Sequence, residues 1–281
     1  MANSQHVFAI IQARMGSSRL PGKVLADITG LPMLARVVER TRRATTVDHV
    51  VVATTTEVED DAVTSLCTQR GYDFFRGSLH NVLDRFYQAA LLSKAEIVVR
   101  ITADCPVIDP ELIDETVNIL SDQSKIRIPQ SGIDFAANRL PPPWGRTYPI
   151  GLDVEACTFT ALERAWKEAD QSFQREHVMP YLYEGVELAA VSPRLATGFS
   201  SRGFGIALLN HVPDYGGLRW TVDTRADLEF IRQIYTRFGS HDDFSWHEVL
   251  TLLQHEPELS QINANVTHKT AFDVDARRVG G

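Results

Sequence analysis

The chain has 281 residues, of which 44% are hydrophobic and 23% charged, a balance that predicts a water-soluble globular protein with a substantial core. Its net charge of −8 argues against binding a nucleic-acid polymer, which requires an extended basic face. The polar first six residues lack the features of a signal peptide, no apolar run approaches the roughly 20 residues that span a bilayer, and three widely separated cysteines predict free thiols in a reducing cytoplasm.

The first half of the chain alternates between two kinds of pattern. Apolar, β-branched runs predict buried strands over residues 7–11, 49–53, 72–75 and 97–101. Amphipathic helical patterns follow each run, beginning at Pro32, after Glu57, at Val82 and near Leu112. This alternation predicts βαβ units, and therefore an α/β fold with a Rossmann-like, mostly parallel sheet flanked by helices.

The second half is less regular. Residues 138–150 contain four prolines and predict a loop that serves as an arm or a lid. We predict strands over residues 151–156, 186–191 and 218–222, and an irregular, glycine-containing segment over residues 195–214. Helices are predicted around residues 159–166, 173–183, 228–235 and 246–253. Together with the first half, these elements predict a single domain over residues 1–255, followed by a polar, loosely held tail over residues 256–281.

The loop after the first strand carries the clearest functional signal. Three cations, Arg14, Arg19 and Lys23, lie close together there and repel one another unless an anion sits among them. Gly16 and Gly22 let backbone N–H groups approach a ligand. Since ligands gather at the carboxyl ends of parallel strands, the pattern predicts a triphosphate-binding loop; an ordinary solvated basic loop is the alternative. The loop has neither the Walker pattern nor the dinucleotide fingerprint.

Two aspartates follow predicted strands in the same way. Asp104 comes after the strand over residues 97–101, and Asp223 comes after the strand over residues 218–222. Paired carboxylates that face a triphosphate suit Mg²⁺, which takes oxygen ligands and shares them with phosphates. The alternative for either aspartate is a helix N-cap. Asp109 and Asp227 are interpreted as an N-cap and a first-turn acid of the following helices.

The segment Ala13-Arg14-x-Gly16-Ser17-x-Arg19-Leu20-Pro21-x-Lys23 resembles the nucleotide-binding loop of the sugar-acid cytidylyltransferases, the CMP-sialate and CMP-Kdo synthetases. The spore-coat polysaccharide biosynthesis (SpsF-like) branch is the most similar, and the resemblance covers about residues 7–253. It implies a nucleotidyltransferase fold of the GT-A-like kind. It also implies Mg²⁺-dependent transfer of CMP from CTP to a small acidic acceptor, a nonulosonate-type sugar acid or a phosphonate, with release of pyrophosphate.

The same resemblance implies roles for individual residues. Catalytic roles fall to Arg14, Arg19, Lys23, Asp104 and Asp223, and the two aspartates, in Thr-Ala-Asp104-Cys-Pro and Trp-Thr-Val-Asp223-Thr, match the family's metal-binding positions. Nucleotide contacts are implied for Gln12, Ala13, Arg14, Gly16, Ser17, Arg19, Lys23, Asp104, and for Arg76 and Ser78 beside the pyrimidine. The family's dimers imply that residues 138–148 reach a neighbouring copy, in a homodimer.

Contacts to the acceptor are less sharply indicated. Asp153 and Glu155 are two residues apart, on one side of a predicted strand, where two acids are costly unless they are paired or bind a ligand. The alternative is a salt bridge to Arg146 or Arg175. Arg175 is also a candidate to hold the acceptor's acid group, and His177 is either a contact or a structural histidine.

Other activities remain open from the sequence. They are nucleotidyl transfer to a sugar phosphate, a GT-A glycosyltransferase that uses a nucleotide-sugar donor, and a non-catalytic nucleotide sensor. A glycosyltransferase typically carries an Asp-x-Asp metal motif. Asp273-Val274-Asp275 has those letters but follows no predicted strand, so we disfavour that activity.

Overall fold

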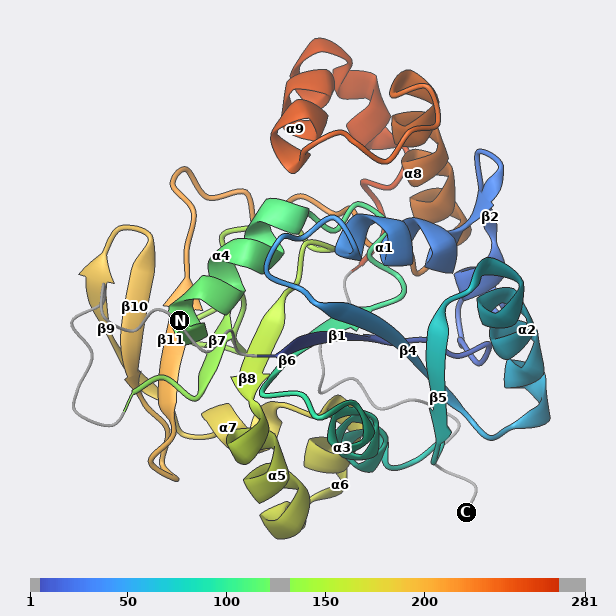
Figure 1. Cartoon of the computed structure of the whole chain (residues 1–281). Coiled ribbons are helices and arrows are strands. Elements are labelled where there is room, and N and C mark those ends of the chain that lie inside the picture. Colours follow the sequence, from blue (N-terminus) through green and yellow to red (C-terminus); the bar gives the residue numbers. More distant parts are fainter. Residues whose placement is uncertain (1–5, 122–131, 268–281) are drawn as a thin grey trace.

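The computed structural model describes residues 6–121 and 132–267. A sheet of nine strands passes through the molecule in the order β5-β4-β1-β6-β8-β7-β11-β10-β9, and helices cover both of its faces (Figure 1). This mixed sheet confirms the predicted α/β fold. The described cysteines, Cys67, Cys105 and Cys157, are buried free thiols, as predicted.

The first half of the sheet is parallel. At its centre β1 (Val7–Gln12) pairs with β4 (His49–Thr55) on one side and β6 (Ile97–Thr102) on the other, and β5 (Asp73–Gly77) extends it beyond β4. The connecting helices are α1 (Met33–Thr41), α2 (Asp61–Arg70), α3 (Val82–Ser93) and α4 (Pro110–Ser121). Short elements between them are η1 (Lys23–Leu25), the ribbon of β2 (Asp27–Ile28) and β3 (Leu31–Pro32), and η2 (Val58–Asp60).

The second half adds mostly antiparallel strands. β8 (Glu155–Thr158) pairs antiparallel with β6 and with β7 (Phe135–Ala137), and β7 pairs parallel with β11 (Gly205–Leu209). β10 (Leu195–Phe199) and β9 (Glu187–Ser192) complete the sheet as antiparallel strands. The helices of this half are α5 (Phe159–Glu168), α6 (Ser172–His177), α7 (Pro180–Tyr183), α8 (Arg225–Arg237), α9 (Trp246–His255) and η4 (Pro257–Gln261).

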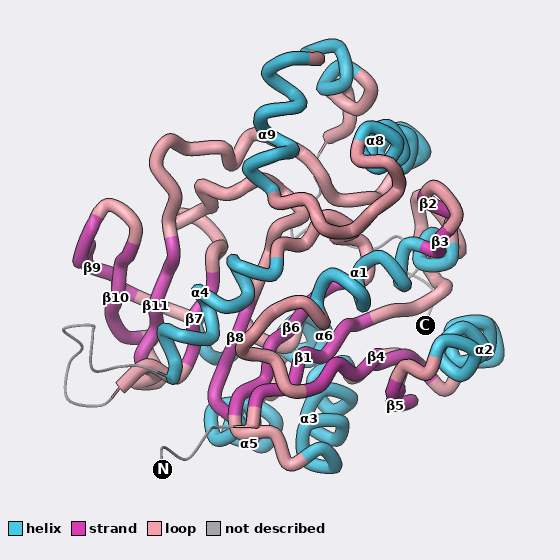
Figure 2. Tube along the Cα trace, turned by 45° about the horizontal axis from the view of Figure 1, so that its top comes forward, coloured by secondary structure: helices cyan, strands magenta, loops and turns pink. Residues whose placement is uncertain are grey.

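The sheet is buried on both faces, which explains why its first strand is a continuous apolar run. Alternate side chains of a strand point to opposite faces. Ala9 and Ile11 belong to the core beneath α1, α4, α8 and α9, whereas Phe8 and Ile10 belong to the core beneath α3 and α5. Figure 2 shows these two groups of helices on opposite sides of the sheet.

Two predicted strands were wrong because their backbone groups are satisfied in another way. In the segment over residues 151–156, the strand begins only at Glu155, since the side-chain amide of Asn138 bonds the backbone of Leu152 and Val154 at 2.7 and 2.9 Å. Residues 218–222 are extended but make only an isolated bridge between Ile150 and Arg219. Asp223 therefore does not follow a strand of the sheet.

Two further expectations for this half were also wrong. The helix over residues 173–183 is divided, because Val178 has a φ of 71° and Pro180 starts a new turn as α7. The segment over residues 195–214 contains β10 and β11. Its glycines permit close strand pairing: a Cβ on Gly198 would lie 1.8 Å from the carbonyl oxygen of Glu187.

Residues of the expected arm or lid and of the expected tail pack against the rest of the domain. In the segment over residues 138–150, Leu140 and Tyr148 are buried, and the role as arm or lid stays a prediction. The start of the tail is ordered against α8, because Leu259 is buried and the amide of Asn263 donates to Asp227 Oδ1 at 3.0 Å. Residues 268–281, with Asp273-Val274-Asp275, lie outside the described part of the chain.

Two buried arginines fasten α1 to the segment between α8 and α9. Arg36 contacts Asp242 Oδ2 at 2.8 Å and lies 4.5 Å from the ring of Tyr235. Arg40 donates to the carbonyl oxygens of Ile108, Asp242 and Phe244 at 2.7–2.9 Å and lies over the Phe244 ring. We call Arg36, Arg40 and Asp242 the anchor cluster.

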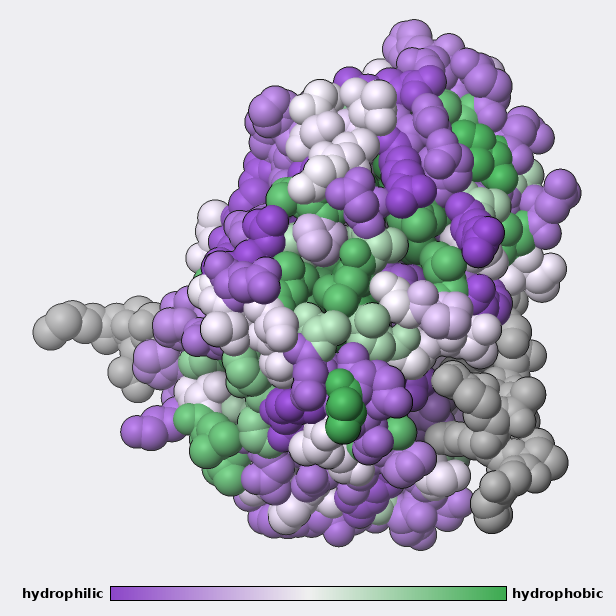
Figure 3. Space-filling model, turned by 90° about the vertical axis from the view of Figure 1, so that its right-hand side faces the viewer, coloured by the Kyte–Doolittle hydropathy of each residue, from purple (hydrophilic) through white to green (hydrophobic). Residues whose placement is uncertain are grey.

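The surface on the side of α2 is mainly polar around an area of apolar side chains (Figure 3). Among the described helices, none combines the length and apolar character needed to cross a membrane.

Candidate active site

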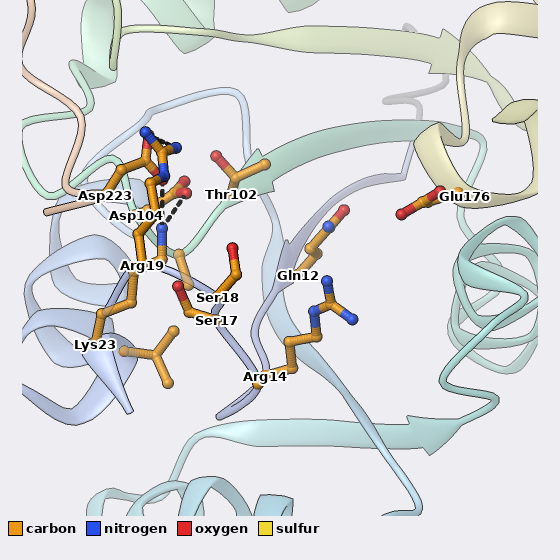
Figure 4. A pocket seen from close by; sticks show the side chains of 13 residues that line it. Gln12, Arg14, Ser17, Ser18, Arg19, Lys23, Thr102, Asp104, Glu176 and Asp223 are labelled. Carbon is orange, nitrogen blue, oxygen red and sulfur yellow. Dashed lines mark hydrogen bonds and ion pairs between the residues drawn. The ribbon is translucent and has the colours of Figure 1, made fainter. Parts of the chain in front are cut away.

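A cavity of about 280 Å³ opens at the carboxyl-terminal edge of β1 and β6 (Figure 4). The two strands pair in parallel with Gln12 opposite Thr102, so the segments that follow them leave the sheet side by side. Parallel sheets place their ligands at this edge. The cavity is lined by Gln12, Arg14, Gly16, Ser17, Ser18, Arg19, Lys23, Val24, Thr102, Ala103, Asp104, Glu176 and Asp223.

The loop after β1 folds back on itself. Gly22 has a φ of 70°, which glycine adopts without strain, and its N–H donates to the carbonyl oxygen of Met15 at 2.9 Å. The N–H of Met15 donates to Asp60 Oδ1 at 2.7 Å. Burial alone would raise the pKa of Asp60, but hydrogen bonds from Met15 and Thr55 outweigh it and lower the pKa. The charged Asp60 thus fixes the start of the loop.

Lys23 contacts two carboxylates that come from distant parts of the chain (Figure 4). Its Nζ lies 2.7 Å from Asp104 Oδ2 and 2.9 Å from Asp223 Oδ1, across sequence separations of 81 and 200 residues. It also donates to the carbonyl oxygen of Val222 at 2.7 Å. Burial alone would lower the pKa of Lys23, but the two carboxylates outweigh it and raise the pKa. The ammonium group is therefore charged at neutral pH.

Both aspartates are kept ionised by their cationic neighbours. Burial alone would raise the pKa of Asp104, but the charge of Lys23 outweighs burial and the repulsion from Asp223, and lowers it. For Asp223, burial is outweighed by Lys23, Arg219 and Arg19, which lower its pKa to about 2. Arg19 and Arg219 lie 2.8 and 2.9 Å from Asp223 Oδ2. We call Arg19, Lys23, Asp104 and Asp223 the pocket cluster.

Asp223 reaches the cavity from an extended segment that precedes α8. The N–H of Val222 donates to the carbonyl oxygen of Asp104 at 2.9 Å, which brings the two aspartates side by side. The N–H of Asp223 donates to Asp227 Oδ2 at 3.0 Å, and Asp227 forms a capping box with Thr224 at the start of α8. This confirms the interpretation of Asp227 as a first-turn acid.

Gly151 packs directly beneath this extended segment. Its φ is 108°, and a Cβ there would lie 2.5 Å from the backbone nitrogen of Thr221 and 2.7 Å from the carbonyl carbon of Trp220. Either distance is too short for a side chain. The close approach lets Ile150 bond the backbone of Leu218 and Trp220 at 2.8 and 2.7 Å, so the path to Asp223 depends on this glycine.

The donor chemistry of the aspartates fits a divalent cation. Within residues 6–121 and 132–267, no three His, Cys, Asp or Glu side chains are grouped to hold a metal by themselves. Mg²⁺, however, is commonly held by one or two carboxylates together with substrate phosphates. Asp104 and Asp223 converge on the position taken by the ammonium group of Lys23, so this point already suits a cation.

The opposite side of the cavity is formed by Gln12, Arg14 and Glu176 (Figure 4). Arg14 makes no ion pair in the part of the chain that the structure describes, so its charge is available to a ligand. Arg85 is buried nearby; it donates to the carbonyl oxygen of Ser78 at 2.7 Å, while its Nε finds no partner among the described residues. Burial and the charge of Arg14 lower the pKa of Arg85 to about 10. Two neighbouring arginines favour an anionic ligand.

Asp153 and Glu155 are both paired within the protein. Asp153 lies 2.5 Å from Arg146, one of the two salt bridges considered from the sequence. Glu155 is buried in β8 and pairs with Arg100 of β6, which also donates to Gln12 Oε1 at 3.2 Å. Neither carboxylate lines the cavity, and their contact with an acceptor stays a prediction.

Arg175 and His177 also lie outside the cavity wall, although Glu176 between them is part of it. Arg175 donates to the carbonyl oxygen of Ala169 at 2.7 Å, a contact that fixes α6 to the end of α5. Burial lowers the pKa of His177, so its ring is neutral near pH 7. The contact of Arg175 gives that residue a structural role, and acceptor binding by Arg175 and His177 stays a prediction.

The structure does not bring the two residues expected beside the pyrimidine into the cavity wall. Arg76 pairs with Asp61 at 2.7 Å and donates to the carbonyl oxygen of Thr55 at 2.8 Å, which joins β5 to α2 and β4. Ser78 Oγ accepts from the N–H of Asn81 at 3.1 Å, before α3. Ala13 is buried under the loop, whereas Gln12, Arg14, Gly16, Ser17, Arg19, Lys23 and Asp104 line the cavity, as expected.

Among the residues that shape the site, Asp60, Arg85, Thr102 and Glu176 were not expected from the sequence. A signal existed for Arg85, since it is a cation within the apolar pattern of the helix that starts at Val82. Thr102 and Glu176 are direct neighbours of predicted segments. Asp60 gave no such signal, because an acid in a first helical turn is common for electrostatic reasons alone.

Comparison with known proteins gives a consistent result. The cytidylyltransferase family model matches residues 8–197. The spore coat polysaccharide biosynthesis protein SpsF of Bacillus subtilis is 32% identical over 256 residues, which cover 90% of this chain and 95% of that protein. A 3-deoxy-manno-octulosonate cytidylyltransferase of Anaeromyxobacter sp. strain K is 41% identical over 119 residues, 41% of this chain and 48% of that protein.

The fold is shared with a solved structure. A cytidylyltransferase from Leptospira borgpetersenii superposes with a TM-score of 0.77 at 29% identity, over 95% of this chain and all of that one (100%).

Proposed function

The chain belongs to the cytidylyltransferase family and its SpsF-like branch, and on that premise we propose that it transfers CMP from CTP to an acidic sugar and releases pyrophosphate. It is an enzyme of the nucleotidyltransferase class. The acid-sugar acceptor is supported by the relative named for 3-deoxy-manno-octulosonate. A nonulosonate-type sugar acid or a phosphonate is the acceptor that we propose.

One observation carries this proposal. The ammonium group of Lys23 contacts both Asp104 and Asp223, and Arg14 faces them across a cavity without an ion pair of its own among the described residues. Cations on two sides and ionised carboxylates between them form a polar site for a metal-bound polyanion. A sugar ring or a neutral base alone would leave the charge of Arg14 without an anionic partner.

The cationic and the acidic residues of the cavity have different roles in the proposed transfer reaction. The acceptor hydroxyl oxygen attacks the α-phosphorus of CTP, the bond from that phosphorus to the β-phosphate oxygen breaks, and the hydroxyl proton passes to solvent. Arg14, Arg19 and Lys23 hold the phosphates in line and stabilise the charge that grows on pyrophosphate. Asp104 and Asp223 would hold Mg²⁺, which supplies Lewis-acid polarisation of the phosphate oxygens when it is bound.

Lys23 has a further task in this scheme. It neutralises Asp104 and Asp223 before substrate arrives, so two carboxylates remain ionised in a partly buried place. A bound triphosphate would give the ammonium group a new partner, and Asp104 and Asp223 would then be able to hold a divalent cation.

Pyrophosphate release tests the proposal directly. Purified protein is supplied with each of the four nucleoside triphosphates, with and without Mg²⁺, against 3-deoxy-manno-octulosonate, N-acetylneuraminate, a phosphonate and a sugar phosphate. We expect release with CTP, Mg²⁺ and an acidic acceptor. Release only with UTP and a sugar phosphate would refute the proposed substrates, and full activity with EDTA would refute the role of the metal.

The homodimer and the cytoplasmic location expected from the sequence stay predictions. Light scattering of the purified full chain would decide the first of them.

A further inference from the structure

Three polar side chains form a row across the face of the sheet that α3 and α5 cover. Arg100 of β6 pairs in register with Ile10 of β1 and with Glu155 of β8. Gln12 lies two residues after Ile10 in β1, and alternate residues of a strand share a face. Ile10 belongs to the core beneath α3 and α5, so Gln12, Arg100 and Glu155 lie on that face. The row ends at the nucleotide cavity, whose wall includes Gln12.

Contacts along this row fix each side chain through the next one. Arg100 Nη1 donates to Glu155 Oε2, and Arg100 Nη2 donates to Gln12 Oε1 at 3.2 Å. Glu155 Oε1 lies 4.0 Å from Nη1 of Arg139, so both oxygens of this carboxylate face a guanidinium. The side chains of Arg100 and Glu155 are 12% and 5% exposed. Glu155 therefore holds Arg100, and Arg100 holds the amide of Gln12.

The contact with Arg100 determines which way the amide of Gln12 points. A guanidinium carries N–H donors and no acceptor, so the Gln12 atom that meets it is the amide oxygen. The amide nitrogen, Nε2, is then directed away from Arg100. Within residues 6–121 and 132–267 no group accepts a hydrogen bond from Nε2, and this nitrogen is not closed off from solvent. Gln12 thus offers two N–H donors to the cavity.

The stability of the fold gives no reason for this row. Its neighbours on the same face are apolar, among them Phe8, Ile10 and Val98. A buried ion pair in such surroundings is often no more stable than two apolar side chains of similar size, because both charges lose their water. Nε of Arg100 is also buried without a hydrogen-bond partner among the described residues. The end of the row at the cavity, where it fixes the donors of Gln12, explains the arrangement better.

The chemistry around Gln12 indicates which ligand group meets these donors. Figure 4 shows Gln12 and Glu176 pointing toward one another on the side of the cavity away from the pocket cluster. The carboxylate of Glu176 would repel a phosphate group placed between these two side chains. A hydroxyl group suits both of them, because its oxygen accepts from Gln12 while its hydrogen is donated to Glu176.

We propose that Gln12 binds a hydroxyl oxygen of the sugar acceptor, and that Arg100 and Glu155 are positioning residues that hold its amide in the required orientation. This inference rests on the proposed transfer reaction and names a determinant of acceptor binding in it. The acceptor is favoured over the ribose of CTP, because the acceptor contacts expected from the sequence include Glu155 and both chain neighbours of Glu176.

Steady-state kinetics of pyrophosphate release by the full chain test this inference. The sugar acid that the parent enzyme uses, 3-deoxy-manno-octulosonate or N-acetylneuraminate, is varied at saturating CTP and Mg²⁺. Binding of CTP is measured by calorimetry without an acceptor. Gln12→Met removes the amide and leaves a side chain of similar size. We expect its KM for the sugar acid to rise about fivefold, the effect of one hydrogen bond, while its Kd for CTP stays within about twofold of the parent value.

A paired replacement tests the positioning role. Arg100→Met combined with Glu155→Leu removes both charges together, so the unfolding temperature should stay the same or rise. The KM for the sugar acid should still rise about threefold, because the amide of Gln12 is no longer held in one orientation. Adding Gln12→Met to this pair should raise KM by a smaller factor than Gln12→Met does in the parent enzyme, since both changes act on one contact.

A matched control removes another ion pair in the same way. Arg237→Met combined with Glu256→Leu deletes a pair that is 2.9 Å apart and joins the end of α8 to the residue after α9. Neither residue lines the cavity, so the KM for the sugar acid should stay at the parent value.

Three results would overturn this inference alone. They are an unchanged KM for the sugar acid in Gln12→Met, an unchanged KM in the paired variant, and a loss of CTP affinity in Gln12→Met, which would support the predicted nucleotide contact instead. Absence of pyrophosphate release by the parent enzyme would refute the proposed function and the inference with it. If the parent enzyme uses UTP and a sugar phosphate, the proposed substrates are refuted, and the same comparison of KM on that acceptor decides the inference.

Discussion

The anchor cluster and the pocket cluster both join cations from the first 40 residues to acids from the last quarter of the chain, yet they differ in what surrounds the charges. Arg36 and Arg40 are 1% and 0% exposed, whereas the side chains of Lys23, Asp223 and Asp104 are 11%, 18% and 27% exposed. The two arginines of the anchor cluster are closed to solvent, although their partner Asp242 is 18% exposed, and the pocket cluster opens into a cavity.

The partners of the cations differ as well. The guanidinium of Arg40 is bound by three carbonyl oxygens, which are neutral and fixed in the backbone. The ammonium group of Lys23 is bound mainly by two carboxylates, which a metal ion or a phosphate can compete for. The anchor cluster therefore joins segments of the fold, whereas in the proposed function the pocket cluster exchanges its partners with a ligand.

The largest expected effect is on stability in the anchor cluster. Arg40→Met should lower the free energy of unfolding by about 3–5 kcal/mol, because three buried carbonyl oxygens lose their donor. Chemical denaturation measures this loss, and the activity of the folded fraction should persist. Arg43→Met is the matched control, since Arg43 also contacts the carbonyl oxygen of Asp242 but is exposed. Equal stability of the two variants would contradict the comparison.

The next largest effect is on catalysis in the pocket cluster. Asp104→Asn should reduce kcat by a factor on the order of 10²–10³, because the variant loses a preorganised charge in the active site. Its unfolding temperature should change little, because Lys23 keeps Asp223 as a partner. Asp109→Asn serves as control: Asp109 accepts from the N–H groups of Glu111 and Trp246 and should affect stability rather than kcat. Retained turnover in Asp104→Asn would remove this residue from the site.

A smaller effect is expected on the pH dependence of stability in the pocket cluster. The pKa of Asp223 is lowered from 3.8 to about 2, so its ionised form contributes about 2 kcal/mol of stability above pH 3.8, and this contribution is lost as the pH falls through 2. Asp223→Asn should therefore cost stability at pH 6 and almost none near pH 2. Urea unfolding at both pH values gives the difference, and a cost that is independent of pH would show that the carboxylate charge is not responsible.

The smallest effect is expected outside both clusters. Arg76 and Asp61 form an exposed pair, with side chains 29% and 58% exposed, and Arg76→Gln should change the free energy of unfolding by less than about 1 kcal/mol. Because Arg76 does not line the cavity, the KM of the Arg76→Gln variant for CTP should stay near that of the parent enzyme. A large rise in KM would instead support the predicted contact with the pyrimidine.

Much of the first half could be predicted because its strands are buried on both faces. The strand predicted over residues 7–11 matches β1 within one residue, and the glycine-containing loop after it lines the cavity as expected. Local patterns suffice when an element is specified by its own apolar run. The convergence of Asp104 and Asp223 with the loop that contains Lys23 was also expected from the sequence. The strand expected before Asp223 is absent from the sheet, and the ion pairs of Lys23 with both aspartates were not expected.

The rest of the sheet could not be predicted for a different reason. Whether residues 218–222 form a strand depends on a partner, Ile150, that is about 70 positions away, and the apolar pattern does not identify it. The glycines of residues 195–214 indicated irregular structure, yet Gly198 permits the close pairing of β10 with β9. The cavity wall likewise includes Glu176, which no spacing linked to Arg14.

Gly151 has a consequence for reading the results of random mutagenesis. Replacing it by alanine would press a methyl group on the peptide bond between Trp220 and Thr221, two residues before Asp223. A screen scored by product formation would rank this position with the catalytic residues, although it never meets a reactant. Variants at Gly151 would differ from variants of catalytic residues, because the enzyme would stay folded while Asp223 is displaced. A loss of function at Gly151 would therefore indicate that this residue positions Asp223, and not that it takes part in the chemistry.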